Sequence, residues 1–332
     1  MKSFSYSISS LTPIVTGDRD HRNTELQATG LLGSLRYQYW LLKAMQAWQS
    51  NPHNPSYPPY SFDLPAKGAH NKRQFLLELA KAGPVVQLFG DTNWKKMFRL
   101  EITDAVRGEA LPCSARADDR QAQKTPYQWK QINLTFRQDR KISFFGGTEG
   151  EMIRKEIEEL MAFIHQYGWL GAAPQNGLGW VKVQGRTLSP HTLPSSNPVF
   201  AAEDISFTAR EARNIVKELT GFFRDKIEKV TESWRKHRYK NSIDYLSQEG
   251  PPVGYEIRRW LRDQKRPSFF FGNKNNAGFV HVTHPLIRQD GGWLVRLRFA
   301  VRPDSMGRLT PARISPAPDA WLHSCETLLK SI

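Results

Sequence analysis

The residues best suited to chemistry crowd one polar loop near the start of the chain. Asp18, Asp20 and His21 lie beside Arg19 and Arg22. A carboxylate and an imidazole next to arginines suit acid–base cleavage of RNA, in which the 2′-hydroxyl takes part. A charged loop equally suits phosphate contact or plain solvation. Cleavage through Asp18 or Asp20 therefore stays open as an alternative, with Mg²⁺ as a cofactor only in that case.

The segment after this loop predicts a basic and aromatic surface. Arg36, Trp40 and Lys43 are spaced i, i+4 and i+7, so on a helix they share one face. Gly30 and Gly33 stand just before that helix, where free backbone N–H groups can bind a phosphate. Together these five residues would form a surface for single-stranded nucleic acid. A solvated helix face behind an ordinary glycine turn is the alternative.

A second glycine feature contains Gly177, Gly179, Trp180 and Lys182. It is not a dinucleotide-binding fingerprint, because it lacks the third glycine and enters a strand instead of opening a helix. Glycines at such a junction let the backbone of a ligand approach closely, and the tryptophan and lysine could stack on it and pair with it. A helix cap followed by a tight turn explains the same glycines.

Other catalytic and metal-binding patterns are missing from the sequence. His281, His284 and Cys325 do not have the spacing of a metal site, and there is no Gly-x-Ser-x-Gly motif. With Cys113 the chain has two cysteines, too few for a disulfide framework. We expect no metal and no cofactor, and nothing here specifies an enzyme.

Hydrophobic periodicity predicts the elements that position these residues. The first half has the order β-α-β-β-α-β, the ferredoxin-like unit, with loop insertions that include a proline-rich stretch over 51–67 and a polar loop over 105–126. The predicted elements are a strand at 4–9, helices at 31–47 and 75–82, strands at 97–102 and 129–136, a helix at 148–167 and a strand at 178–184.

The second half predicts another mixed α/β domain. A Pro- and Ser-rich connection over 187–204 separates an N-terminal domain, residues 1–186, from a C-terminal domain, residues 205–332. This domain should contain a helix at 208–223, a basic stretch at 224–240, strands at 279–283 and 293–301, and a helix at 319–330.

The charge of the chain indicates an acidic partner. Lys and Arg number 47 against 32 Asp and Glu among 332 residues, a formal net charge of +15. Such an excess attracts polyanions, of which nucleic acid is the commonest in a cell. No apolar run approaches the roughly 18 residues that span a bilayer, and the start of the chain lacks the apolar core of a signal peptide. We expect a cytoplasmic protein with no membrane partner.

Four segments, in order, resemble motifs of one protein family. The stretch from Thr12-Pro-Ile-Val-Thr-Gly to Trp40 resembles the "TP…GG…ELR..S.KG.LR.WW" opening of the RAMP proteins of type III CRISPR effectors. Gln87-Leu-Phe-Gly resembles the family's "LFG". The segment from Gly168 through Gly-Leu-Gly-Trp-Val resembles its "LGARxxxGFGxV" loop. His281-Val-Thr-His-Pro-Leu-Ile-Arg resembles its "R.SPL.I" strand. The similarity is closest to the first subunit of the Cmr (type III-B) complex.

The resemblance implies an α+β protein with ferredoxin-like (RRM-like) RAMP domains, the second domain included. It implies a subunit that holds guide crRNA near its 3′ end and helps to capture target RNA in antiviral defence, without cleaving it. Its partners would be the guide, the target and other subunits of the effector ribonucleoprotein. Arg19, His21 and Arg22 would then contact the guide–target duplex, beside the two glycine-containing surfaces.

Departures from the family pattern point to a divergent member, such as a type III-D-like variant. Leu32 replaces the family's Lys before the glycine of the first helix, Ala173 replaces the Arg of "LGAR", and Asp18 stands where a second Gly is common. Related subunits cut target RNA with an Asp in this loop, so an endoribonuclease remains one alternative. A basic scaffold that docks only proteins is another, and it would show little salt sensitivity and retain no RNA.

Overall fold

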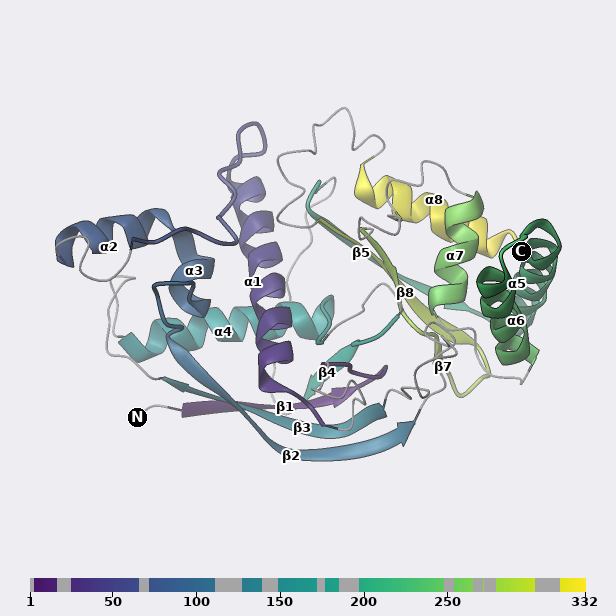
Figure 1. Ribbon diagram of the computed structural model, residues 1–332, viewed down its shortest axis with the longest axis horizontal. Coiled ribbons are helices and arrows are strands. Elements are labelled where there is room, and N and C mark those ends of the chain that lie inside the picture. Colours follow the sequence, from purple (N-terminus) through teal and green to yellow (C-terminus); the bar gives the residue numbers. More distant parts are fainter. Residues whose placement is uncertain are drawn as a thin grey trace.

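The computed structural model shows two antiparallel sheets side by side, each with helices packed on it (Figure 1). It describes residues 3–16, 25–65, 72–110, 127–138, 149–171, 177–184, 197–247, 254–264, 271, 279–301 and 317–332. We call the part up to β4 the N-terminal unit and the part from β5 onward the C-terminal unit.

The N-terminal unit has the strand order β2-β3-β1-β4, with every pair antiparallel. This is the strand order of the ferredoxin-like unit, so the predicted fold class is confirmed. Its elements are β1 (Ser3–Ser10), α1 (Ala28–Ser50), α2 (Lys72–Lys81), α3 (Gly83–Phe89), β2 (Phe98–Ala110), β3 (Tyr127–Gln138), α4 (Glu149–Gln166) and β4 (Val181–Gln184).

Two local features differ from the prediction. β2 continues to Ala110, through the start of the stretch predicted as a loop, and it pairs with β3 across irregular register shifts near Val106. The second is α3, a helix absent from the prediction. α2 ends at Lys81, close to the predicted end of the 75–82 helix, and α3 begins at Gly83 with Pro84 at one of its first two positions, where the missing N–H costs no helix hydrogen bond.

The C-terminal unit has the strand order β5-β8-β6, with β7 also paired to β8. Its elements are β5 (Phe200–Phe207), α5 (Ala209–Lys229), α6 (Ser233–Ser247), α7 (Gly254–Gln264), β6 (Val280–Val282), β7 (Leu286–Ile287), β8 (Trp293–Ala300) and α8 (Pro318–Lys330). The predicted mixed α/β character is confirmed. β5 begins inside the range predicted as a linker. The prediction missed the start of this strand because Ala202, Glu203 and Asp204 weaken its hydrophobic alternation.

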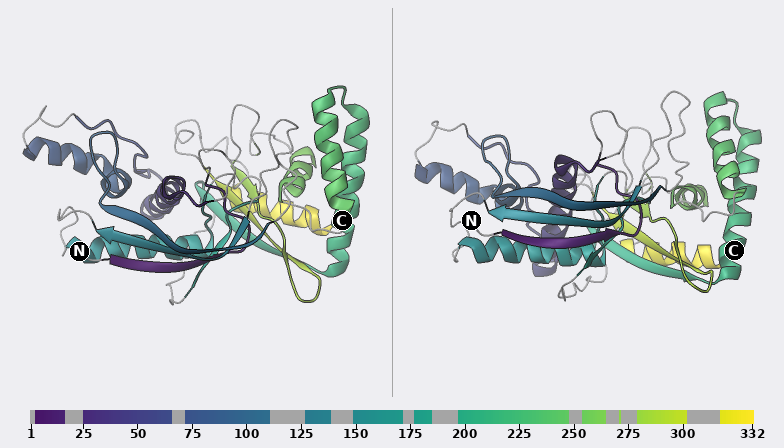
Figure 2. Two further views of the ribbon diagram at one scale, coloured as in Figure 1. Left: turned by 60° about the horizontal axis from the view of Figure 1, so that its bottom comes forward. Right: turned by 90° about the horizontal axis from the view of Figure 1, so that it is seen from below.

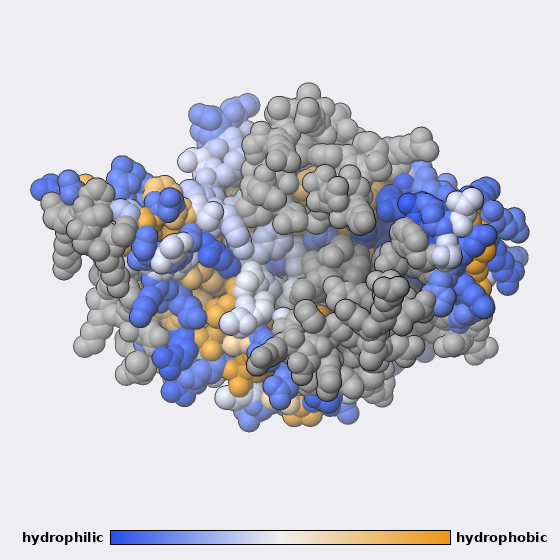
Figure 3. All heavy atoms as spheres, in the orientation of Figure 1, coloured by the Kyte–Doolittle hydropathy of each residue, from blue (hydrophilic) through white to orange (hydrophobic). Residues whose placement is uncertain are grey.

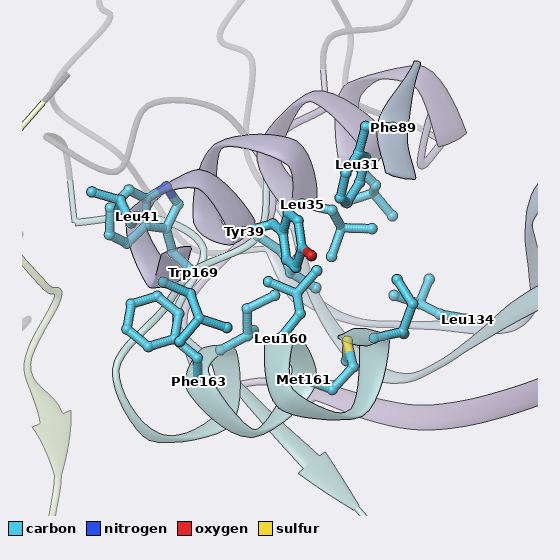
Figure 4. Packing of buried hydrophobic residues seen from close by; sticks show 14 of the residues in the cluster. Leu31, Leu35, Tyr39, Leu41, Phe89, Leu134, Leu160, Met161, Phe163 and Trp169 are labelled. Carbon is cyan, nitrogen blue, oxygen red and sulfur yellow. The ribbon is translucent and has the colours of Figure 1, made fainter. Parts of the chain in front are cut away.

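α1 and α4 cover one face of the first sheet, and their contact forms the main core (Figure 4). Leu35 and Tyr39 of α1 point toward Leu160 and Met161 of α4 in that view, and all four are buried. The 3.6-residue spacing of apolar residues in both helices explains this packing. A separate core fills the space between the second sheet and α5, α7 and α8.

No helix among the described residues lies on the opposite face of the first sheet (Figure 2, right). Polar side chains line it, as the hydrogen bond of 2.8 Å between the hydroxyls of Ser5 and Thr135 shows. The alternation of small polar and large apolar residues in β1 places its serines on this face and Tyr6 and Ile8 in the core. The sheet therefore has one buried side and one open side.

Candidate nucleic-acid interface

The N-terminus of α1 is where the predicted site residues begin. Gln27 precedes the helix without a side-chain cap, and the first turn contains no acidic residue. The hydroxyl of Thr16 accepts the N–H of Gln27 at 2.8 Å and donates to the carbonyl of Glu25 at 3.4 Å. These bonds hold together the two ends of segment 17–24, so that this segment starts and finishes at the positive end of the helix dipole.

Five predicted site residues lie in that segment, outside the described residues. The predictions that it contacts RNA, and the alternative that it cleaves RNA, therefore stay predictions. These residues are Asp18, Arg19, Asp20, His21 and Arg22.

Gly30 and Gly33 lie inside α1 and do not precede it, which corrects the predicted backbone cradle. A Cβ atom on Gly30 would stand 2.4 Å from the carbonyl oxygen of Thr16. Gly30 thus permits the close approach of the preceding chain to the helix. Gly33 is exposed, with nothing within 4 Å of the corresponding Cβ position, and it lies past the first turn, where N–H groups bond within the helix.

The prediction of an exposed basic face at Arg36, Trp40 and Lys43 is wrong. Trp40 is buried, and its indole N–H donates to the carbonyl of Pro58 at 2.9 Å. A guanidinium nitrogen of Arg36 lies 2.6 Å from the carbonyl oxygen of Tyr60, in the proline-rich loop.

The charges of Arg36 and Lys43 are also paired inside the protein. Arg36 lies 3.3 Å from a carboxylate oxygen of Asp91. The ammonium of Lys43 lies 2.6 Å from Glu156 and 3.4 Å from Glu159 on α4. This face of α1 therefore holds the proline-rich loop and α4 in place, instead of meeting solvent.

Gly177 and Gly179 have φ angles of +85° and +86°, which favour glycine. A Cβ on Gly177 would lie 2.6 Å from Nδ1 of His284, and one on Gly179 would lie 2.2 Å from the carbonyl oxygen of Leu170. Both glycines therefore allow contact between protein segments. This differs from the predicted approach of a ligand and from a simple cap.

Trp180 and Lys182, predicted to join the same surface, point to different environments. Trp180 is buried, with the guanidinium of Arg296 4.5 Å from its ring centroid. Lys182 is exposed on β4 and pairs in register with Ser9, on the open face of the sheet. Of the second predicted surface, only Lys182 reaches solvent.

The structure nevertheless brings the two glycine regions together. Cβ atoms built on Gly30 and Gly171 would meet the carbonyl oxygens of the adjacent residues Thr16 and Val15, at 2.4 and 2.5 Å. Segment 17–24 and segment 172–176 therefore leave the described structure at neighbouring points, beside the start of α1. Sequence reasoning treated them as two surfaces, and the structure places their ends at one.

Two exposed basic surfaces were not predicted as sites, although one of them includes the predicted residue Lys182. One is the open sheet face, where Arg99 and Arg137 are register partners and Lys182 lies further along the sheet. The other is the helical pair α5 and α6, which stands at one end of the molecule and is covered by hydrophilic residues in Figure 3. Its exposed cations are Arg210, Arg213, Lys217, Arg224, Lys229, Arg235, Lys236 and Lys240. The basic stretch at 224–240 was the available signal for this second surface.

One cluster among the described residues brings three potential metal ligands within 4.8 Å of one another, namely Glu203, His323 and Glu326. Burial, then the hydrogen bond and charge of Glu326, raise the pKa of Glu203 to about 7. Lys330 already places its ammonium 2.6 Å from Glu326. Glu203 of β5 and Glu326 of α8 therefore share a proton and join the two elements, and Lys330 is the cation that balances Glu326.

The four-stranded sheet of the N-terminal unit, with α1 and α4 on one face, defines a ferredoxin-like protein in which α1 begins without a side-chain cap. The family model of the RAMP superfamily matches residues 7–182, and this chain belongs to that superfamily. No curated protein matches the chain. None of the helices among the described residues is long and apolar enough to cross a membrane.

A solved structure resembles part of this chain at low similarity. It is a chain of the type III-B Cmr-β complex, solved by cryo-EM bound to cognate target RNA. The two chains are 12% identical with a TM-score of 0.33, and the alignment covers 54% of this chain and 53% of that one. The matched region thus spans about half the length of the similar protein.

Proposed function

We propose that this chain is an RNA-binding subunit of a type III CRISPR effector, one that holds guide RNA near its 3′ end and helps to capture complementary target RNA. The observation that carries the proposal is the match of the RAMP superfamily to residues 7–182, together with the ordered motif resemblances in the sequence. Its partners are the guide, the target and the other effector subunits. It works as part of a ribonucleoprotein.

The charge distribution supports RNA as the partner. The net charge of +15 persists after Arg36 and Lys43 are paired within the protein. The uncapped start of α1 offers N–H groups and a positive dipole end to a phosphate, and the adjoining segment 17–24 contains Arg19 and Arg22 together with Asp18 and Asp20. Backbone contact of this kind suits a subunit that must accept any guide sequence.

The first experiment is a tagged pull-down from cells that carry the neighbouring genes, followed by sequencing of the bound nucleic acid. We expect uniform short RNAs with repeat-derived ends. A random mixture of RNAs, or no RNA, would overturn the proposal. The same preparation measures target cleavage in the assembled complex, with Asp18→Ala and Asp20→Ala as variants. If the complex cleaves target RNA and either variant abolishes this cleavage, the subunit is an endoribonuclease and the non-cleaving role is wrong.

A salt titration with paired variants tests the contact region. Removing both Arg19 and Arg22 by alanine substitution should reduce the slope of log K against log salt by about 1.4, because each lost contact with a single strand accounts for about 0.7. Arg288→Ala is the matched control, since Arg288 is exposed on the C-terminal unit and pairs with Asp290 at 2.9 Å. An equal reduction of this slope in the Arg288→Ala protein and in the double variant of Arg19 and Arg22 would show only a general effect of net charge.

A further inference from the structure

β8 directs two arginines toward the N-terminal unit. Arg296 and Arg298 are two residues apart, so they share one face of the strand. The guanidinium of Arg298 lies 5.4 Å from the ring centroid of Trp169 and 6.0 Å from that of Trp180. Both tryptophans are buried and belong to the N-terminal unit. The arginines therefore lie where the two units meet.

Arg298 is fully buried and has no hydrogen-bond acceptor in the part of the chain that the structure describes. Its relative exposure is 0%, and Nε, Nη1 and Nη2 bond to no described atom. Arg258 shows how a buried arginine is normally accommodated here, because its Nε donates to the carbonyl of Val280 at 2.8 Å and its Nη2 donates to that of Phe271. A buried charge needs both a counter-charge and acceptors. The aromatic rings beside Arg298 supply neither.

The neighbouring groups compensate this charge only in part, through the carboxylate of Asp204. The carboxylate of Asp204 is held by Arg296, through bonds of 2.5 and 2.7 Å to Nε and Nη2. Nη1 of Arg296 is itself buried without an acceptor. Burial, then the charge of Arg296, lower the pKa of Arg298 well below its usual range. The junction thus has an excess of positive charge and of donors.

A further unsatisfied donor belongs to the residue that follows Thr283 on the chain. His284 follows Thr283, whose hydroxyl accepts the backbone N–H of Arg296 at 2.8 Å. Nδ1 of His284 accepts the N–H of Gly254 at 2.9 Å, so the ring proton is on Nε2, which is buried without a partner. The unsatisfied nitrogens of these three side chains are therefore all donors, and donors with excess positive charge are matched by an oxyanion.

We propose that Arg298 and Nη1 of Arg296 bind a tetrahedral oxyanion of the phosphate class at the junction of the two sheets, where it ties β8 to the tryptophans of the N-terminal unit. The ligand chemistry is a phosphate group, present either as a free ion or as a phosphodiester of bound RNA. The proposal concerns a buried site within the fold, and it does not require the effector function proposed above.

The experiment measures binding of radiolabelled orthophosphate to the full chain by equilibrium dialysis, and thermal unfolding in phosphate against chloride at equal ionic strength. We expect one phosphate per chain and a rise in the unfolding midpoint of about 3 to 6 °C at a hundredfold excess over Kd. A wild-type protein that binds no phosphate, or that chloride stabilises equally, overturns the proposal.

Three variants assign the effect to Arg298. Arg298→Met should abolish phosphate binding, and Arg298→Lys should weaken it at least tenfold, because the ammonium lacks the guanidinium fork. Arg288→Met, an exposed arginine on the same unit, should bind as the wild type does. Unchanged phosphate binding in Arg298→Lys refutes the assignment. Because Arg298→Lys keeps the positive charge, it also serves as the test variant if Arg298→Met fails to fold.

A competition experiment identifies the source of the phosphate. Unlabelled single-stranded RNA is added to the wild-type protein at constant ionic strength. Displacement of the labelled phosphate by this RNA identifies a phosphodiester as the natural occupant. Retention of the label at saturating RNA identifies a free structural ion. Because phosphate binding is measured without RNA, a failed pull-down and a failed dialysis experiment would refute different proposals.

Discussion

Two glycines three residues apart in α1 should respond in opposite ways to the same substitution. Alanine at Gly33 places its methyl group in open space, since nothing lies within 4 Å of that position. Alanine at Gly30 places its methyl group 2.4 Å from the carbonyl oxygen and 2.9 Å from the Cβ of Thr16. Real Cβ atoms do not approach backbone this closely, so the chain before the helix must move.

The expected magnitudes follow from helix propensity and overpacking. Gly33→Ala should stabilise the protein by about 1 kcal/mol, because glycine in a helix interior costs about that much relative to alanine. Gly30→Ala gains less propensity in the first turn and incurs an overpacking cost of about 1–3 kcal/mol. It also disturbs the two hydrogen bonds of the Thr16 hydroxyl. We expect the two variants to differ in free energy of unfolding by about 2–4 kcal/mol.

Urea unfolding of both variants and the wild type, followed by circular dichroism and tryptophan fluorescence, measures this difference. Midpoints should rank in the order Gly33→Ala, wild type, Gly30→Ala. The RNA affinity of Gly30→Ala should also fall relative to Gly33→Ala, since segment 17–24 starts at Thr16. Equal stability of the two variants would refute the argument that Gly30 exists for the approach of Thr16.

Three further predictions concern buried or paired charges. Burial lowers the pKa of His284 to about 4, below the unfolded value of about 6.5. The free energy of unfolding that neutral His284 contributes is therefore fully present above pH 6.5. It is lost as the pH falls toward 4, by about 3 kcal/mol in all. His284→Gln should flatten this part of the stability profile, and a parallel profile would contradict the assignment. Glu203 has the opposite sign. Its pKa of about 7 means that stability declines as the pH rises from about 4.5 through 7, a decline that Glu203→Gln should remove in thermal unfolding between pH 5 and 8. Lys43→Met should destabilise the chain by about 1–3 kcal/mol, because it leaves Glu156 without its cation. Adding Glu156→Gln should restore part of that loss, and a purely additive double variant would contradict the pairing.

The architecture of the N-terminal unit was accessible from sequence because its periodicity is strong. Ile157 and Leu160, apolar residues of the predicted 148–167 helix, are buried, and the alternation in β1 correctly assigns Tyr6 to the core. The signal was weaker where charged or small residues interrupt the alternation. This explains why β5 was read as part of a linker and why β2 was ended too early.

The candidate site was harder to predict because a pattern identifies a residue type without its partner. Arg36 and Lys43 were correctly placed on one helix face, but their partners Asp91, Glu156 and Glu159 lie 55 to 116 positions away along the chain. A basic helix face opposite leucines looks the same whether its charges meet solvent or another helix. Only the tertiary contacts distinguish the two cases.

The same limit applies in reverse to Arg298. In sequence it alternates with Leu297 and Phe299, as an outward-facing cation of a half-buried strand would. In the structure it is more completely buried than Arg36 or Lys43, and it lacks the acceptors that they have. The cations that looked available for a ligand are satisfied internally, and one that looked like ordinary surface charge is not. Pairing, and not residue type, therefore decides where an anion should be sought, and by that criterion the junction of the two sheets ranks ahead of the face of α1.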